Sequence, residues 1–259
     1  MTRTALITGA SSGIGKEIAQ LAARDRLDLV LVARQEDKLH ALAQELEKAH
    51  SVRVHVVAAD LADTAAPQRI YDRLQQSGVV VDILVNNAGF GVHGPFLEMS
   101  LERQSAMIEV NVQALMKLTH LFAIGMKSRG FGRVLHIAST AGFQSGPYMA
   151  VYYATKSFVI LFSEALAEEL KGTGVTVTCH CPGATATEFG AVSGNDKTRL
   201  FKQGQVASVV DVASDAWGAM NGGRVLKIHG VLNLAMMEAQ RLGPRALTRK
   251  ITSWINDVV

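Results

Sequence analysis

Seven short apolar runs alternate with segments of helical periodicity, and this alternation constrains the fold more than any other feature of the chain. The apolar runs are rich in β-branched residues and bounded by polar residues or glycine, as strands are, and they span residues 4–8, 27–33, 52–58, 82–86, 132–139, 174–181 and 224–230. Between them, apolar residues recur at helical spacing over residues 13–24, 36–49, 65–77, 101–128, 153–171 and 208–221. Several runs are apolar almost throughout, which is typical of strands buried on both faces of a parallel sheet. The sequence therefore predicts an α/β fold with a doubly wound parallel sheet of about seven strands and helices on both faces.

The composition is that of a globular chain with a sizeable core. Hydrophobic residues make up 48% of the 259 residues and charged residues 19%, and the sequence contains no linker, repeat or low-complexity segment. We therefore expect a single domain over residues 1–259, in which residues 231–259 form a C-terminal helical extension. The net charge of +3 has no basic block behind it, which argues against a nucleic-acid partner.

The cysteine content and the apolar segments indicate where the protein works. Its two cysteines, Cys179 and Cys181, are too few and too close together for the disulfide framework of a secreted protein. The first ten residues have no extended apolar core, and the long uncharged stretch over residues 134–155 is interrupted by polar residues. The sequence predicts a cytoplasmic protein with neither a signal peptide nor a transmembrane segment.

A glycine-rich turn, "GASSGIG" (9–15), lies between the first strand and the first helix. Glycine at positions 9, 13 and 15 permits a tight turn and lets a pyrophosphate approach backbone N–H groups at the helix N-terminus. The spacing differs from the commoner G-x-G-x-x-G pattern, and a purely structural turn could have the same sequence. Taken alone, the motif leaves both interpretations open.

The end of the second strand indicates which dinucleotide such a turn would bind. An acidic residue at this position accepts a hydrogen bond from the ribose 2′-OH of NAD, whereas an arginine accommodates the 2′-phosphate of NADP. The strand ends at Arg34, and Asp28 lies at its other end. Because the planar guanidinium matches phosphate geometry, the sequence favours NADP over NAD. In the alternative, Arg34 is solvated and neutralised by Glu36 or Asp37.

The motifs together resemble the classical short-chain dehydrogenase/reductase family over about residues 3–230. The matching segments occur in the order and spacing of that family: "TGASSGIG" (8–15), "DL" (60–61), "NNAG" (86–89), Asn111 in "VNV", Ser139 in "HIAST", "YYATK" (152–156) and "PGATAT" (182–187). The resemblance implies a Rossmann-type fold and hydride transfer between a nicotinamide cofactor and a carbonyl compound or alcohol.

The resemblance also implies a catalytic set. The family pattern Y-x-x-x-K selects Tyr152 with Lys156, and Ser139 lies thirteen residues before that tyrosine. Tyr152 would act as the general acid/base, Ser139 would hydrogen-bond the substrate oxygen, and Lys156 would lower the pKa of the phenol and bind the nicotinamide ribose. Asn111 would hold a water that links Lys156 to solvent. Tyr153 falls outside the pattern and is expected to pack or to line the pocket.

The residues expected to bind the cofactor come from five segments of the family pattern and from the end of the second strand. They are Gly9, Ser11, Ser12, Gly13, Ile14, Gly15, Arg34, Asp60, Leu61, Asn87, Ala88, Gly89, Tyr152, Lys156, Pro182, Gly183, Thr185 and Thr187. Among these, Thr187 would contact the nicotinamide carboxamide. No metal site is expected, because strand alternation places His180 of "CHC" (179–181) opposite the two cysteines and the sequence shows no second ligand pair nearby.

The loops after the later strands offer a mainly apolar substrate pocket. Residues 90–96, 140–149 and 184–205 would contribute Phe90, Val92, His93, Phe143, Tyr148, Met149 and Phe189. The predicted function is therefore an oxidoreductase that transfers a hydride between NADP(H) and the carbonyl or secondary alcohol of an apolar small molecule. In the alternative, the chain is a catalytically silent NADP-binding sensor or scaffold, although such a protein need not retain all four catalytic groups.

Two features bear on assembly. The helices over residues 101–128 and 153–171 carry more apolar positions than one buried stripe requires, including Met107, Leu115, Leu118, Phe122, Phe158, Leu161, Phe162 and Leu166. A homodimer through these helices is expected rather than a tetramer. Residues 231–259 predict an amphipathic helix with a break at Gly243-Pro244, which would dock on its own domain, cover a second interface or rest on a membrane.

Overall fold

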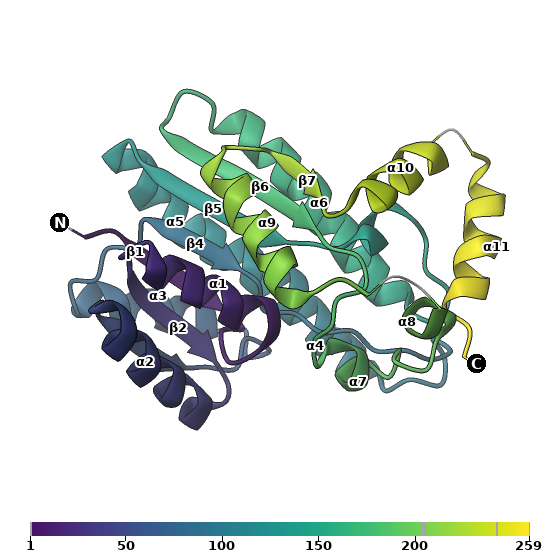
Figure 1. Cartoon of the computed structure of the whole chain (residues 1–259), viewed down its shortest axis with the longest axis horizontal. Helices are drawn as coiled ribbons and strands as arrows, with labels where there is room; N and C mark the ends of the chain where they lie inside the picture. Colours follow the sequence, from purple (N-terminus) through teal and green to yellow (C-terminus); the bar gives the residue numbers. More distant parts are fainter. Residues whose placement is uncertain (1, 204–205, 242, 259) are drawn as a thin grey trace.

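The computed structural model describes residues 2–203, 206–241 and 243–258, and its centre is one parallel sheet (Figure 1). The strand order is β3-β2-β1-β4-β5-β6-β7. The strands are β1 (Thr4–Thr8), β2 (Asp28–Ala33), β3 (Val54–Ala58), β4 (Ile83–Asn86), β5 (Gly132–Ile137), β6 (Val175–Cys181) and β7 (Leu226–Ile228). All six neighbouring pairs are parallel, which confirms the predicted doubly wound sheet of seven strands.

Helices cover both faces of this sheet. They are α1 (Gly13–Arg24), α2 (Glu36–His50), α3 (Ala66–Gln76), α4 (Leu101–Ile108), α5 (Leu115–Arg129), α6 (Ala150–Glu169), α7 (Phe189–Ser193), α8 (Arg199–Gln203), α9 (Val209–Asn221), α10 (Val231–Gln240) and α11 (Arg245–Ile255). One buried cluster joins the sheet to α1, α2 and α9 through Ile18, Leu39 and Trp217. A second joins the opposite face to α3 and α5 through Ile70 and Phe122. The expected layers are confirmed.

The segment over residues 101–128 is not the single α-helix that its periodicity predicts. A π-helical turn, η1 (Glu109–Ala114), separates α4 from α5. Asn111 lies inside this turn and its side chain is bonded to the main chain of Phe90, so the wide turn aims a buried polar side chain out of the helix. Helical periodicity does not reveal such an interruption, because the apolar face continues through it.

The strand order places the ligand-binding crevice. β2 and β3 lie on one side of β1, and β4 to β7 lie on the other. β1 and β4 are therefore neighbours in the sheet, although two strands lie between them in sequence. Crevices at such a switch point open beyond the carboxyl ends of the strands. The glycine turn follows β1 and the "NNAG" segment follows β4, and both therefore reach the same crevice.

The long helices bury some of their apolar residues and expose others. Met107 and Phe122 are buried in the chain's own core, whereas Ile124 on α5 and Leu161 on α6 are 59% and 67% exposed. The apolar positions left over for a partner are thus fewer than the sequence indicates. The dimer remains a prediction.

The C-terminal segment forms two helices that extend beyond the carboxyl ends of the strands (Figure 1). The expected break at Gly243-Pro244 separates α10 from α11. We refer to these two helices as the C-terminal arch. No helix in the described ranges has the length and apolar character that a membrane crossing requires.

Candidate active site

The α6 helix brings two of the predicted catalytic residues to the crevice from its first two turns. Tyr152 and Lys156 are 8% and 6% exposed, and Ser139 follows β5 at the same edge of the sheet. The Lys156 ammonium lies 5.8 Å from the centre of the Tyr152 ring and donates to the Ile137 carbonyl oxygen at 2.8 Å. These three side chains line one cavity, so the spacing in sequence becomes proximity in space.

Burial shifts the pKa values of the ionisable groups at this site. Burial raises the pKa of the Tyr152 phenol above its ordinary value, although the Ser139 hydroxyl acts to lower it. Burial is the largest influence on this pKa, and the lowering by Lys156 that the family resemblance implies stays a prediction. Burial also lowers the pKa of Lys156 to about 8. Tyr152 is therefore a protonated phenol at neutral pH.

Asn111 lies behind this site and fixes it in place. Its Oδ1 accepts from the Phe90 N–H at 3.0 Å, and its Nδ2 donates to the Phe90 carbonyl at 2.9 Å and to Thr155 Oγ1 at 3.1 Å. Thr155 in turn donates to the Tyr152 carbonyl oxygen at 2.7 Å. The side chain thus ties the loop after β4 to the catalytic helix. The water that Asn111 was expected to hold stays a prediction.

The glycine turn leaves the N-terminus of α1 open to the same cavity. Ser12 precedes the helix without a side-chain capping bond, and the first turn contains no acidic residue. Gly9 has a φ of +66°, which favours glycine, and a Cβ on Gly15 would lie 2.3 Å from the Gly9 carbonyl oxygen. Open backbone N–H groups at a helix N-terminus form a site for a phosphate, so this turn fits a dinucleotide.

Two other segments complete the cradle around the glycine turn. The Asn87 side-chain amide donates to the Thr8 and Gly9 carbonyl oxygens at 3.0 and 3.3 Å, which joins the end of β4 to the turn. From the loop after β6, Thr187 comes close enough that a Cβ on Gly13 would lie 3.3 Å from its Cγ2. The structure therefore brings segments far apart in sequence around one space.

Arg34 lies at the end of β2 with its side chain exposed at the margin of the cavity. Glu36, one of the two acids that could neutralise it, pairs with His40 at 3.7 Å. Within the described part of the chain, no carboxylate forms an ion pair with the Arg34 guanidinium. The cation is therefore available to an anionic ligand such as a ribose phosphate.

Nearly every residue predicted for the site lines this cavity, which has a volume of about 1810 Å³. The two exceptions are Gly15, which supports the turn from behind, and Asn111, which supports the catalytic helix. Of the expected pocket wall, Phe90, Met149 and Phe189 line the cavity. The other four predicted wall residues do not: Val92, His93, Phe143 and Tyr148.

Sequence reasoning missed the contribution of the C-terminal arch. Met236 on α10 and Leu247, Ile251 and Trp254 on α11 line the cavity. The amphipathic spacing of α11 was visible in the sequence, but the direction of its apolar face was not.

The second tyrosine of "YYATK" connects to the same C-terminal segment. The Tyr153 hydroxyl donates to Asn256 Oδ1 at 3.1 Å, and both residues are buried. Adjacent positions on a helix point in different directions, and although both rings line the cavity, the Tyr153 hydroxyl is directed to the C-terminal segment. Tyr153 therefore packs as expected, with a specific partner that the sequence did not reveal.

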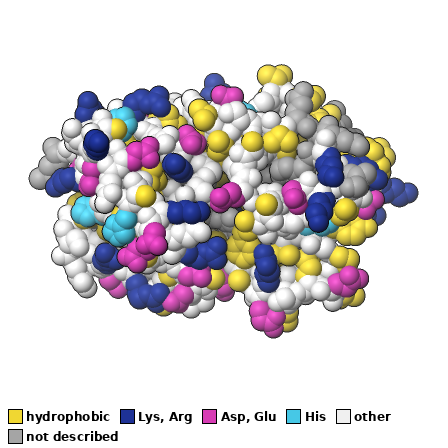
Figure 2. All heavy atoms as spheres, turned by 60° about the horizontal axis from the view of Figure 1, so that its bottom comes forward, with side chains coloured by type: hydrophobic (Ala, Val, Ile, Leu, Met, Phe, Trp, Pro, Cys, Tyr) yellow, Lys and Arg dark blue, Asp and Glu magenta, His cyan; other side chains and the backbone are white. Residues whose placement is uncertain are grey.

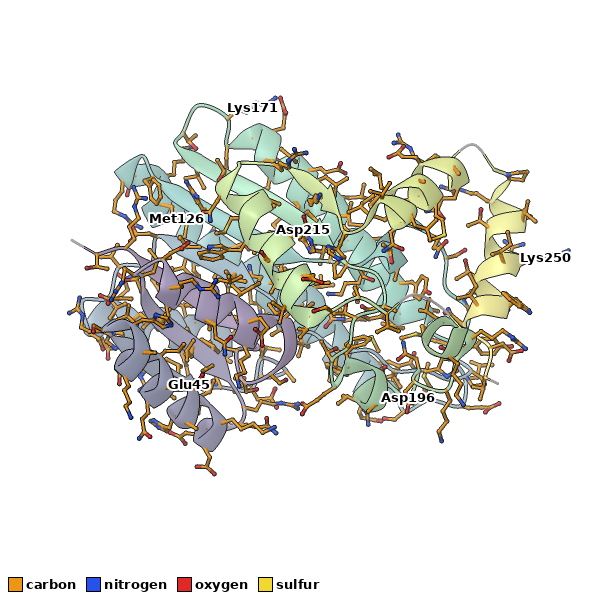
Figure 3. The ribbon with its side chains drawn as sticks, viewed as in Figure 1. Glu45, Met126, Lys171, Asp196, Asp215 and Lys250 are labelled. Carbon is orange, nitrogen blue, oxygen red and sulfur yellow. The ribbon has the colours of Figure 1, made fainter. Side chains whose placement is uncertain are left out.

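A polar cluster lies beside the cavity at β6. His180 Nε2 and His229 Nδ1 lie 3.1 and 3.0 Å from one Asp215 oxygen, and this geometry could hold a metal ion. The sequence-based view that no second ligand pair stands near His180 is thus wrong. Lys227 approaches the other Asp215 oxygen at 3.2 Å, and the buried Nδ1 of His180 has no partner among the described residues. Hydrogen bonds from the two histidines and the Lys227–Asp215 ion pair join β6, the end of β7 and α9, and they account for these contacts (Figure 3 labels Asp215). The absence of a metal stays a prediction.

Comparison with known proteins places the chain in a family. Residues 3–198 match the family described as short chain dehydrogenase. The chain is 37% identical over 219 residues to sulfoacetaldehyde reductase 2 of Chromohalobacter salexigens, covering 82% of this chain and 86% of that protein. It is 34% identical over 194 residues to human very-long-chain 3-oxoacyl-CoA reductase, covering 73% of this chain but only 61% of that protein. The chain spans less than two thirds of the length of several such relatives. It belongs to the short-chain dehydrogenase family of oxidoreductases.

Solved structures agree with this assignment. A short-chain dehydrogenase from Sphingobium yanoikuyae in complex with NADPH has a TM-score of 0.83 at 34% identity and covers 93% of this chain and 94% of its own. A short-chain dehydrogenase/reductase from Burkholderia phymatum in complex with NAD has a TM-score of 0.84 at 26% identity, with coverage of 96% and 95%. The Rossmann-type fold is confirmed, and relatives of this fold hold either nicotinamide cofactor.

Proposed function

We propose that the protein is an NADP(H)-dependent oxidoreductase that interconverts the carbonyl and secondary alcohol of a mainly apolar small molecule. The observation that carries this proposal is that one cavity is lined by the glycine turn, by Tyr152 and by apolar side chains. The two enzymes compared above are named as reductases of an aldehyde and of a 3-oxoacyl thioester, which supports carbonyl reduction.

The proposed chemistry assigns one task to each polar side chain at the centre of the cavity. The bound nicotinamide supplies the hydride in reduction and accepts it in oxidation. A phenol is protonated at neutral pH, and burial raises the pKa of Tyr152 further, so Tyr152 can donate its proton to the carbonyl oxygen. The Ser139 hydroxyl hydrogen-bonds the same oxygen while negative charge develops on it. The Lys156 ammonium, 5.8 Å from the ring, stabilises the phenolate that remains.

The cofactor proposal rests on Arg34. The glycine turn would hold the pyrophosphate, and the unpaired guanidinium at the end of β2 would hold the 2′-phosphate of NADP(H). The NADPH complex of a relative at 34% identity supports this choice. Since another relative binds NAD, the affinities for both cofactors must be measured on this chain.

A turnover screen tests the proposal. Purified protein is mixed with NADPH or NADH and a panel of aliphatic and aromatic ketones and aldehydes, and the absorbance of the reduced cofactor is followed over time. We expect turnover of apolar carbonyl compounds with NADPH, and of the matching secondary alcohols with NADP⁺. A protein that binds NADPH but turns over none of the panel would instead be the silent sensor or scaffold.

A further inference from the structure

Few residues of the C-terminal arch are buried against the rest of the chain. Met237 is the one buried residue that the structure describes on α10, and Thr252 is the one on α11. Hydrophobic side chains reach the surface chiefly in the right half of Figure 2, the end that carries the arch in Figure 1. On α11, Leu247, Ile251 and Trp254 are 54%, 49% and 58% exposed. Three large apolar side chains are thus half-covered by the chain itself.

The exposed apolar side chains of α11 lie on one face of the helix. The residues of this helix that line the cavity are Leu247, Thr248, Ile251, Trp254 and Ile255, whose spacing defines one helix face. Lys250 points outward from the opposite side (Figure 3). In the described parts of α10 and α11, no ionisable side chain lines the cavity. The apolar face of the arch is therefore a wall of the cavity.

A buried asparagine holds this wall in position. Asn256 follows α11 and is 1% exposed. Its Nδ2 donates to the Pro147 carbonyl at 3.0 Å, its Oδ1 accepts from Tyr153, and its own carbonyl accepts from His93 Nε2 at 2.7 Å. Three segments around the active site thus converge on one residue at the end of the arch.

The cavity is larger than a single ligand requires. Its volume of about 1810 Å³ exceeds the range of roughly 300–1,000 Å³ that single-ligand pockets occupy. The lining contributed by the arch is uncharged and mostly apolar, with the adaptable side chains of Met236 and Met237 on α10 and the apolar residues of α11, beside the polar side chains of Asn233, Gln240 and Thr248. A flexible hydrocarbon chain matches such a surface, since it needs no hydrogen-bond partner and can follow an irregular wall.

We propose that the space between α10 and α11 is a binding subsite for an unbranched hydrocarbon chain attached to the carbonyl that reacts at Tyr152. This inference rests on the proposed function and names the part of the substrate that the arch recognises. Each methylene that enters the subsite leaves water and covers the exposed faces of Leu247, Ile251 and Trp254. Because these side chains are about half-exposed, each methylene is expected to raise kcat/KM about two- to fourfold.

A homologous series of methyl ketones tests this expectation. The kcat/KM values for 2-butanone, 2-hexanone, 2-octanone and 2-decanone are measured with saturating NADPH, and the slope per methylene is compared between variants. Ile251→Gln places a polar group in the lining and is expected to lower the slope to below about 1.5-fold per methylene. Leu234→Gln is the matched control, because Leu234 is 46% exposed on α10 and lies outside the cavity lining. A flat series in the unmodified protein, or equal slopes in the two variants, would overturn the proposal.

A binding measurement separates this inference from the proposed function. In Tyr152→Phe protein with NADPH, quenching of Trp254 fluorescence reports occupation of the arch without turnover, and Trp254→Phe gives the blank. We expect 2-decanone to bind at least tenfold more tightly than 2-butanone. If this holds while no carbonyl is reduced by the unmodified protein, the subsite stands and the proposed function fails. If ketones are reduced but bind with equal affinity at all lengths, the proposed function stands and the subsite fails.

Discussion

Replacing Asn256 with alanine should detach the C-terminal arch from the catalytic helix. The change removes both side-chain hydrogen bonds of Asn256 and leaves the Tyr153 hydroxyl and the Pro147 carbonyl without these partners. An unsatisfied buried polar group costs about 1–3 kcal/mol, so the two together should lower the free energy of unfolding by about 2–6 kcal/mol. The His93 contact involves the main-chain carbonyl of residue 256 and is retained. Tyr153→Phe leaves a single amide oxygen unpaired and should cost about 1–3 kcal/mol.

Urea unfolding of the two single variants and the double variant gives these free energies. The two residues are in direct contact, so the double variant should be less destabilised than the sum of the singles, by at least about 0.5 kcal/mol. Gln76→Ala is the control, because Gln76 is an exposed amide at the end of α3 and its loss should change the free energy by no more than about 0.5 kcal/mol. An Asn256→Ala cost below 1 kcal/mol, or strict additivity with Tyr153→Phe, would refute the described contact.

Three further predictions follow from other parts of the molecule. NADPH should bind at least tenfold more tightly than NADH, about 1.4 kcal/mol, and Arg34→Asp should reverse the order; equal affinities in the unmodified protein would contradict the role of Arg34. Burial lowers the pKa of His136 to about 3 and that of His180 to about 4, so below pH 6.5 the unfolded chain binds protons that the folded chain does not. Stability should therefore fall as the pH drops, by roughly 2 kcal/mol for each histidine at pH 5, and a total change below 1 kcal/mol between pH 7 and pH 5 in urea unfolding would argue against this. Exposed apolar residues on α5 and α6, among them Ile124 and Leu161, should pair in a homodimer, and light scattering that gave a monomer or a stable tetramer at micromolar concentration would count against it.

The parts of the fold that depend on local pattern could be predicted from the sequence. The helix over residues 13–24 has the predicted bounds, because a glycine turn and an apolar periodicity both mark it. The seven strands are present, although the last is shorter than its apolar run, at Leu226–Ile228. Strand alternation and the motif spacing also predicted which segments meet at the crevice, since the carboxyl ends of parallel strands share one edge.

The features that depend on contacts across the sequence could not be predicted in this way. The π-helical turn at Asn111 exists because its side chain reaches the main chain of Phe90, twenty-one residues away. The raised pKa of Tyr152 depends on how much water the folded cavity excludes, which spacing does not specify. The orientation of α11 depends on Asn256, whose partners lie more than a hundred residues earlier in the chain.

We infer that the two adjacent tyrosines have different roles, Tyr152 in proton transfer and Tyr153 in holding the C-terminal segment. Turnover of the Tyr152→Phe and Tyr153→Phe variants tests this most directly. Both changes remove one hydroxyl from a buried ring of α6, so each variant is the control for the other. With NADPH and a ketone found in the screen, Tyr152→Phe should lose on the order of 10²–10⁴-fold in kcat, while its affinity for NADPH stays within about twofold. Tyr153→Phe should keep most of its kcat, because its hydroxyl contacts Asn256 and not the cavity centre. Substantial turnover by Tyr152→Phe, or an equal loss in Tyr153→Phe, would contradict the account.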